Sequence, residues 1–182
     1  MSNALIMVTP RLRLIAAELA HLRTELDDPA QLGVLLGAEM PATWPPGEYD
    51  RGATAYFLSE YERRGSDAVG WYGWYAVRPA HGAGGAQVVG AGGYFGPPSP
   101  EGSVEIGYSI AEEWRSRGYG SELALALTDR ALRDPRVRRV IAQTAADNAA
   151  SHVVLRRAGF TCLGAAGESG KWRYVRSAKA TA

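Results

Sequence analysis

The sequence has little of what marks a secreted or metal-binding protein. It holds a single cysteine, Cys162, in 182 residues, so no disulfide can form within the chain and a reducing, cytoplasmic location is expected. Cys162 lies in the short apolar run 160–163, which predicts that its side chain is buried. The three histidines, His21, His81 and His152, are scattered without the spacing of metal ligands, so no metal is expected.

Long apolar segments and a charge excess are also lacking. A membrane-spanning helix needs about 18 apolar residues in a row, and no segment approaches that length. The apolar run 4–8 is too short for a signal peptide, and Arg11 and Arg13 follow it rather than precede it. The 20 lysines and arginines balance 19 aspartates and glutamates, for a net charge of +1. This balance argues against a nucleic acid or a membrane surface as partner.

Apolar residues and glycines are plentiful. Hydrophobic residues make up 46% of the chain, and its length is typical of one domain, so we expect a single domain over residues 1–182. The 22 glycines exceed the usual share of about 7%. Such a surplus indicates either many loops or several places where the backbone must approach a neighbour closely.

Hydrophobic periodicity predicts strands that alternate with helices. Strands are expected at 11–15, 69–77, 87–94, 104–110, 137–144, 160–164 and 171–176, and helices at 16–26, 29–37, 50–64, 119–133 and 148–158. This order is typical of an α/β protein with antiparallel strand pairs at both ends.

The segment between the strand at 104–110 and the helix at 119–133 carries the pattern Arg115-x-x-Gly118-x-Gly120. The first N–H groups of a helix are unpaired and carry partial positive charge. Glycines at that point let the backbone approach a pyrophosphate, and Arg115 and Arg117 add positive charge. The alternative is an ordinary glycine-rich helix start.

Four motifs in order resemble the GNAT superfamily of N-acetyltransferases. Arg-x-x-Gly-x-Gly after a strand is similar to that family's acetyl-coenzyme A signature, and 140–144 resembles its fifth strand. Asn148-Ala-Ala-Ser151 followed by Gly159-Phe160 is similar to its Asn-x-x-Ser…Gly-Phe helix. The opening segment 9–14 resembles the branch that acetylates the N-termini of ribosomal proteins. The resemblance covers about residues 9–176, with the last residues expected to fray.

The resemblance implies an α/β (α+β) fold with a central mixed, mostly antiparallel sheet of about seven strands, flanked by helices and splayed at its middle strands. It implies acetyl-CoA as donor and direct attack by a primary amine in a ternary complex. The amine would belong to a small molecule or a protein N-terminus. A homodimer is a further implication. One alternative stays open, a catalytically silent module that binds or senses acyl-CoA, because this chain has Leu155 where many family members have a tyrosine.

The cofactor-binding residues implied by the resemblance lie on the central strand, the glycine turn and the later helix. They are Ser109, Ile110, Arg115, Arg117, Gly118, Tyr119, Gly120, Ser121, Asn148 and Arg156. Two have plain structural alternatives: Asn148 can cap its own helix, and Arg156 can lie on a solvated helix face.

Acetyl transfer to an amine needs a base, because a typical amine is protonated at pH 7. Glu105 is the candidate, since the family often carries a glutamate there; a structural carboxylate is the alternative. Alternation puts Glu105 and Ser109 on one face of the strand and Tyr108 on the other. Many family members have a tyrosine that acts as general acid where this chain has Leu155. The resemblance implies Ser151 as the replacement acid, because the ribosomal-protein branch carries a serine there; the alternative is that Ser151 only bonds the cofactor or the backbone.

Substrate contacts are implied for the region of the first helices and the loop between them. The candidates are Glu39, Trp44 and, on the following strand, Trp74. Alternation along 71–75 predicts Trp71 and Tyr75 on one face of that strand and Tyr72 with Trp74 on the other. Burial in the core is the alternative for each aromatic side chain.

Overall fold

The computed structural model describes residues 5–167 and 170–178 of one chain. The strands are β1 (Ile6–Val8), β2 (Arg13–Ala16), β3 (Gly73–Arg78), β4 (Gln87–Tyr94), β5 (Ser103–Ile110), β6 (Arg139–Ala145), β7 (Thr161–Ala165) and β8 (Lys171–Ser177). The helices are α1 (Leu19–Asp27), α2 (Pro29–Leu36), α3 (Arg51–Arg64), α4 (Tyr119–Arg133) and α5 (Ala149–Arg157), with short 3-10 turns at Gly65–Ala68 and Glu112–Trp114. The predicted fraying of the chain end falls largely on 179–182, outside the described residues.

All the described strands join one sheet in the order β1-β2-β3-β4-β5-β6-β8-β7. Only β5 and β6 run parallel; every other neighbouring pair is antiparallel. The described sheet has eight strands, where about seven were predicted. The added strand is β1, where Ile6 pairs with Ile15 and Val8 with Arg13. Three residues without alternation gave it no strand signature in the sequence.

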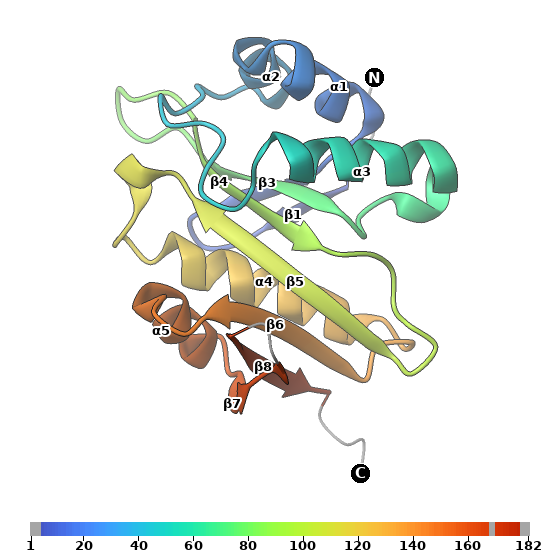
Figure 1. Ribbon diagram of the computed structural model, residues 1–182. Coiled ribbons are helices and arrows are strands. Elements are labelled where there is room, and N and C mark those ends of the chain that lie inside the picture. The colour runs from blue at the N-terminus through green and yellow to red at the C-terminus, as the bar shows by residue number, and fades with distance from the viewer. Residues whose placement is uncertain (1–4, 168–169, 179–182) are drawn as a thin grey trace.

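Helices cover both faces of this sheet (Figure 1). On one face, Tyr72 packs against Phe57 of α3, and the Tyr75 hydroxyl reaches Glu25 of α1. On the other face, the guanidinium of Arg130 in α4 lies over the ring of Trp74. The helix α5 packs beside α4 on that second face. The buried core fills both interfaces, as a sheet with two apolar faces requires.

The predicted alternation along 71–75 is wrong at its start. Trp71 and Trp74 both stack on Arg130, so they share a face, while Tyr72 lies on the other face among the rings of α3. The reason is that β3 begins only at Gly73 and residues 69–72 turn, with Gly70 at a φ of 75°. A period of two holds only within an extended strand.

The environment of Cys162 also differs from the prediction. Its thiol lies exposed on β7, an outer strand of the sheet, rather than in the core. An apolar run at a sheet edge has only one covered side, which the sequence does not reveal. Among the described helices, none is long and apolar enough to cross a membrane. Within the same residues, no group of three or more His, Cys, Asp or Glu side chains could hold a metal ion.

Candidate active site

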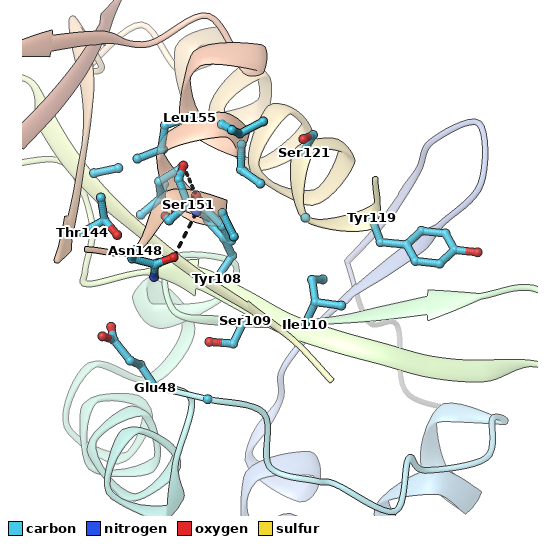
Figure 2. A pocket seen from close by; sticks show the side chains of 18 of the residues that line it. Glu48, Tyr108, Ser109, Ile110, Tyr119, Ser121, Thr144, Asn148, Ser151 and Leu155 are labelled. Atoms are coloured by element: carbon cyan, nitrogen blue, oxygen red, sulfur yellow. Dashed lines mark hydrogen bonds between the residues drawn. The ribbon is translucent and has the colours of Figure 1, made fainter. Parts of the chain in front are cut away.

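The sheet opens between its two parallel strands. Pairing of β5 with β6 runs from Ser103–Arg139 to Ile106–Ala142 and then stops, although β5 continues to Ile110 and β6 to Ala145. The predicted splayed middle strands are therefore confirmed. A cleft of about 760 Å³ lies in this opening and extends to the start of α4 and to α5. Figure 2 shows the side chains that line it.

The backbone of β5 presents donors to this cleft. The Phe95 N–H donates to the Glu105 carbonyl at 3.0 Å, and the Ala111 N–H donates to the Val89 carbonyl at 2.9 Å, so odd-numbered residues of β5 bond to β4. Because bonding direction alternates along a strand, the N–H groups of Tyr108 and Ile110 point to the open side. Backbone donors at such a point can bind an amide or stabilise an oxyanion.

The glycine-rich turn forms one end of the cleft. Gly118 is the N-cap of α4 with a φ of 83°, and Gly118, Tyr119, Gly120 and Ser121 all line the cleft. A left-handed residue at this position lets the chain enter the helix with its first N–H groups turned toward the opening. This is the geometry that binds phosphate groups at a helix N-terminus.

Arginine side chains brace this turn. The Arg115 side chain lines the cleft, and its Nε donates to the Ile110 carbonyl at 3.1 Å. Arg11 reaches across from the segment between β1 and β2, donating from Nη1 to the Arg117 carbonyl at 2.8 Å and from Nε to Glu122 at 2.7 Å. The glycine-rich turn is thus fastened to the segment between β1 and β2.

Two predicted cofactor contacts lie outside the cleft. The Arg117 side chain turns back, donating to the Glu113 carbonyl at 3.2 Å and lying 5.0 Å from the Trp114 ring. Arg156 is exposed on α5, and its neighbour Arg157 lines the cleft instead. The helical spacing Ser151–Val154–Arg157 could have indicated this, because residues three apart share a helix face.

The start of α5 lies at the centre of the cleft. The Ser151 N–H donates to Oδ1 of Asn148 at 3.1 Å, so Asn148 caps the helix, as its structural alternative proposed, while both residues line the cleft. The cap holds Ser151 with its hydroxyl toward β5 (Figure 2). Leu155, one turn further on, is fully buried.

Sequence reasoning missed Tyr108 as a site residue. Its hydroxyl lies 2.9 Å from Oγ of Ser151 and 3.5 Å from the Ser151 carbonyl oxygen. Loss of hydration on burial raises the pKa of Tyr108 to about 12, so the phenol keeps its proton at neutral pH. Alternation could assign its face of the strand, but not its contact with a helix 40 residues away.

Carboxylates lie across the sheet from this pair of hydroxyls. Glu105 lines the cleft, and its Oε1 accepts from Nε2 of Gln143 on β6 at 3.0 Å. Ser109 follows on the same face of β5, beside Gly47 of the loop before α3. Glu48 of that loop also lines the cleft, opposite Asn148 (Figure 2). Glu105 and Ser109 thus lie where alternation predicted.

The three predicted substrate contacts do not line the cleft. Trp74 is fully buried on the α4 side of the sheet, where its indole N–H donates to the Gly70 carbonyl at 3.2 Å. Trp44 packs on Tyr75 and donates from its indole to Glu25 at 2.9 Å. Glu39 bonds Gln87 at the start of β4. Trp74 thus has the core position that was its alternative, and Trp44 is half-buried beside the cleft.

Glu25 is a buried carboxylate that secures the loop beside the cleft. It accepts hydrogen bonds from the Trp44 indole and from the hydroxyls of Tyr49 and Tyr75 at 2.6–2.9 Å. Desolvation raises the pKa of Glu25, and these three donors only partly oppose that rise. Trp44 and Tyr49 flank Gly47 and Glu48, so the network fixes this wall of the cleft.

Comparison with known proteins places the chain in a family. The model for an acetyltransferase (GNAT) domain matches residues 15–161. YjdG of Bacillus subtilis (strain 168), an uncharacterized N-acetyltransferase, is 29% identical over 170 residues, which are 93% of this chain and 98% of that protein. The chain belongs to the GNAT acetyltransferase family, and it is accordingly an acyltransferase.

Solved structures share the fold. RimL, a ribosomal L7/L12 alpha-N-protein acetyltransferase solved with coenzyme A, matches with a TM-score of 0.60 and 22% identity over 97% of this chain and 100% of its own. A GnaT-family acetyltransferase from Bordetella pertussis matches with a TM-score of 0.65 and 19% identity, over 95% and 99% of the two chains. The microcin C7 self-immunity acetyltransferase MccE, solved with acetyl-CoA and AMP, matches with a TM-score of 0.60 and 13% identity, over 93% of each chain.

Proposed function

We propose that the protein transfers the acetyl group of acetyl-CoA to a primary amine of a small molecule or a protein N-terminus, by direct attack in a ternary complex. The observation that carries this proposal is the cleft between β5 and β6, which reaches the N-terminus of α4 and exposes strand backbone on the way. Solved relatives of the same fold carry coenzyme A or acetyl-CoA, which supports the choice of donor.

The donor would bind along the α4 and α5 face of the opening. The N–H groups at the start of α4, with Arg115 beside them, suit a pyrophosphate. The N–H groups of Tyr108 and Ile110 suit the amides of an extended arm and the thioester oxygen. Arg157 and Lys171 add positive charge along the same cleft.

The acceptor amine would approach from the face that bears Glu105. A carboxylate there can take a proton from the ammonium group, directly or through water, so that the neutral amine attacks the thioester carbon. Glu48 lies on the same cleft wall and can attract the cation before reaction. Glu105 is half-buried and reachable by solvent, as a group that must pass a proton to water needs to be.

The leaving sulfur would lie on the opposite face, near Ser151. A hydroxyl there can donate a hydrogen bond to the thiolate as the carbon–sulfur bond breaks. The proposal also includes a cytoplasmic location, which the single cysteine supports. A homodimer is included on the family resemblance alone.

Coenzyme A release is the direct test. The protein is incubated with acetyl-CoA and a panel of amines that includes amino acids, polyamines, amino-bearing antibiotics and peptides with free N-termini. Saturable acetyl-CoA binding together with amine-dependent thiol release is expected. Tight binding without release for any amine would instead support the alternative, a silent acyl-CoA-binding module, which the hydroxyl-free Leu155 favours.

The base assignment is tested by Glu105→Gln. The substitution keeps the contact with Gln143 but removes the proton acceptor, so kcat is expected to fall by about 10²-fold or more while acetyl-CoA affinity holds. Glu101→Gln, on the exposed turn before β5, is the matched control and should retain full activity. Full turnover by Glu105→Gln at every pH would remove Glu105 from the mechanism.

A further inference from the structure

We propose that Tyr108 is a positioning residue whose hydroxyl orients Ser151, so that the Ser151 O–H points at the sulfur leaving acetyl-CoA. This inference rests on the proposed acetyl transfer and adds a residue to its leaving-group side. Tyr108 and Ser151 come from a strand and a helix 43 positions apart, yet their hydroxyl oxygens lie 2.9 Å from each other inside the cleft.

The direction of this hydrogen bond decides what Ser151 can do. A serine hydroxyl has one proton and two lone pairs, and so does a tyrosine hydroxyl, although its pKa differs. If Ser151 donated to Tyr108, the single Ser151 hydroxyl proton could not also bond to the leaving sulfur. If Tyr108 donates, the Ser151 proton is free to point into the cleft.

Two observations favour Tyr108 as the donor. The single phenolic proton has two acceptors in reach, Oγ of Ser151 at 2.9 Å and the Ser151 carbonyl oxygen at 3.5 Å, and the much shorter distance favours donation to Oγ. Burial also raises the pKa of Tyr108 to about 12, so the phenol stays protonated throughout the pH range in which an amine reacts.

The backbone of Ser151 is fixed independently of this contact. Its N–H donates to the Asn148 side chain at 3.1 Å, which sets the first turn of α5. What remains to be fixed is the rotation of the hydroxyl itself. Tyr108 accomplishes this from the strand, and Leu155, buried and apolar, offers no hydroxyl from the helix. Hydrogen bonds in a chain polarise one another, so the Tyr108 donor also strengthens the Ser151 donor.

The step balances without an ionised hydroxyl. The amine nitrogen bonds to the carbonyl carbon, the carbon–sulfur bond breaks, and its electron pair stays on sulfur. Ser151 donates a hydrogen bond to that thiolate, and Tyr108 keeps its own proton throughout. Glu105 takes one proton from the ammonium group before the attack and passes it to water, and it takes a second from the nitrogen once the nitrogen–carbon bond has formed. The released thiolate takes a proton from water.

Tyr108 and Glu105 are separated by the strand itself. Glu105 belongs to the odd-numbered face of β5, and Tyr108 to the even-numbered face that meets α5. The group that removes a proton and the group that assists the leaving sulfur therefore approach the same carbon from opposite sides.

The test compares Tyr108→Phe, Ser151→Ala and the double variant of the full-length protein. Each loses one hydrogen bond to the developing thiolate, directly or through Ser151, so kcat should fall about tenfold in each. The KM for acetyl-CoA should stay within about twofold. Because both residues act on one proton, the double variant should be no slower than Ser151→Ala.

Tyr94→Phe is the matched control. It removes a hydroxyl of the same kind from the neighbouring strand, where it donates to the Leu127 carbonyl at 2.6 Å, outside the cleft. Its stability should fall and its kcat should not. Thermal unfolding of every variant separates folding loss from catalytic loss.

Several outcomes would overturn the inference. Wild-type kcat in Tyr108→Phe, wild-type kcat in Ser151→Ala, or additive losses in the double variant would each do so while leaving the proposed acetyl transfer intact. An equal kcat loss in Tyr94→Phe would do the same. A wild-type protein that binds acetyl-CoA but releases no thiol with any amine would end both proposals.

Discussion

The Tyr75 hydroxyl donates to the Glu25 carboxylate at 2.6 Å, joining the middle of β3 to the first helix. Tyr49 donates to the same oxygen at 2.9 Å, and Trp44 to the other oxygen. Within the part of the chain that the structure describes, no lysine, arginine or histidine forms an ion pair with Glu25. Three neutral donors hold a carboxylate that is only 5% exposed.

Removing this carboxylate should cost considerable stability. Glu25→Ala leaves an indole N–H and two hydroxyls buried without their acceptor, so the free energy of unfolding should fall by about 3 kcal/mol or more. Chemical denaturation measures this change. Glu62→Ala, whose partner Arg23 and own side chain are both more than half exposed, should change stability by less than about 1 kcal/mol.

The pH dependence of Glu25 has a definite sign. Its folded-state pKa is raised by desolvation, so the folded state holds this proton more tightly than the unfolded state. Its contribution to stability is therefore complete below about pH 4.5 and is lost as the pH rises through the folded-state pKa. Unfolding of wild type and Glu25→Gln across pH 4–8 checks this: the stability of the wild type relative to the variant should increase as the pH falls. A constant difference would contradict it.

Glu122 should behave in the opposite way. Desolvation alone would raise its pKa, but hydrogen bonds from Thr9 and Arg11 outweigh burial and lower it. Glu122→Gln should lose about 1 kcal/mol at pH 7, because the amide has one acceptor oxygen where the carboxylate has two and its NH2 group must then face one of the donors. The difference should begin to shrink below about pH 4.5 and vanish as the pH falls through the lowered folded-state pKa. Since Arg11 also holds the Arg117 carbonyl, acetyl-CoA should bind this variant more weakly. Unchanged affinity would show that this brace is dispensable.

Gly120 should separate binding from stability. A methyl group there would lie 3.4 Å from Val154 and 3.5 Å from Ile110, both lining the cleft. Gly120→Ala should leave stability equal or better, because alanine favours a helix, yet weaken acetyl-CoA binding about tenfold. Gly52→Ala, at the second position of α3, is the helical control with unchanged affinity. Calorimetric titration with acetyl-CoA measures the affinity of both variants. A wild-type affinity in Gly120→Ala would contradict the proposed position of acetyl-CoA.

Gly93 should tolerate no side chain. A Cβ atom there would lie 1.9 Å from the carbonyl oxygen of Tyr72, which accepts from the Tyr94 N–H. The strand must move to admit it, so Gly93→Ala should lose about 3 kcal/mol or more. Gly84→Ala, in the exposed turn between β3 and β4, should stay within about 0.5 kcal/mol. Denaturation midpoints compare the two, and similar values would contradict the steric argument.

Regular, strongly patterned elements were the most predictable from the sequence. The helix at 119–133 and the strand at 87–94 match α4 and β4 to the residue. The helix has a clear period and ends before Asp134-Pro135, and the strand lies between the glycine-rich turn 81–85 and the loop 96–100. The turn at Gly118 was equally readable, since glycine spacing before a helix is itself a signal. The face that bears Glu105 followed from alternation alone.

Features that depend on the meeting of distant segments were not predictable. The contact of Tyr108 with Ser151 requires the crossing of α5 over β5, which no local pattern encodes. The sequence left Trp74 between the substrate site and the core, because its burial depends on Arg130 and α4 covering that face. Cys162 was expected to be buried because an apolar run does not show that its strand lies near a sheet edge. The substrate wall was equally hidden, since Glu48 carries no signature of its own.

The brief ladder between β5 and β6 has a mechanical consequence. In the described sheet the ladder between the five N-terminal strands and the three C-terminal ones has four residue pairs, from Ser103–Arg139 to Ile106–Ala142, supported by the side-chain bond from Gln143 to Glu105. Beyond these pairs, α4 and α5 connect the two groups of strands. An extended ligand that hydrogen-bonds to the backbone of Tyr108 and Ile110 would bridge β5 and β6 where the two strands are not paired. Backbone hydrogen exchange should then slow in both parts of the sheet when acetyl-CoA binds. The stability of the sheet would thus depend in part on occupancy by the proposed donor.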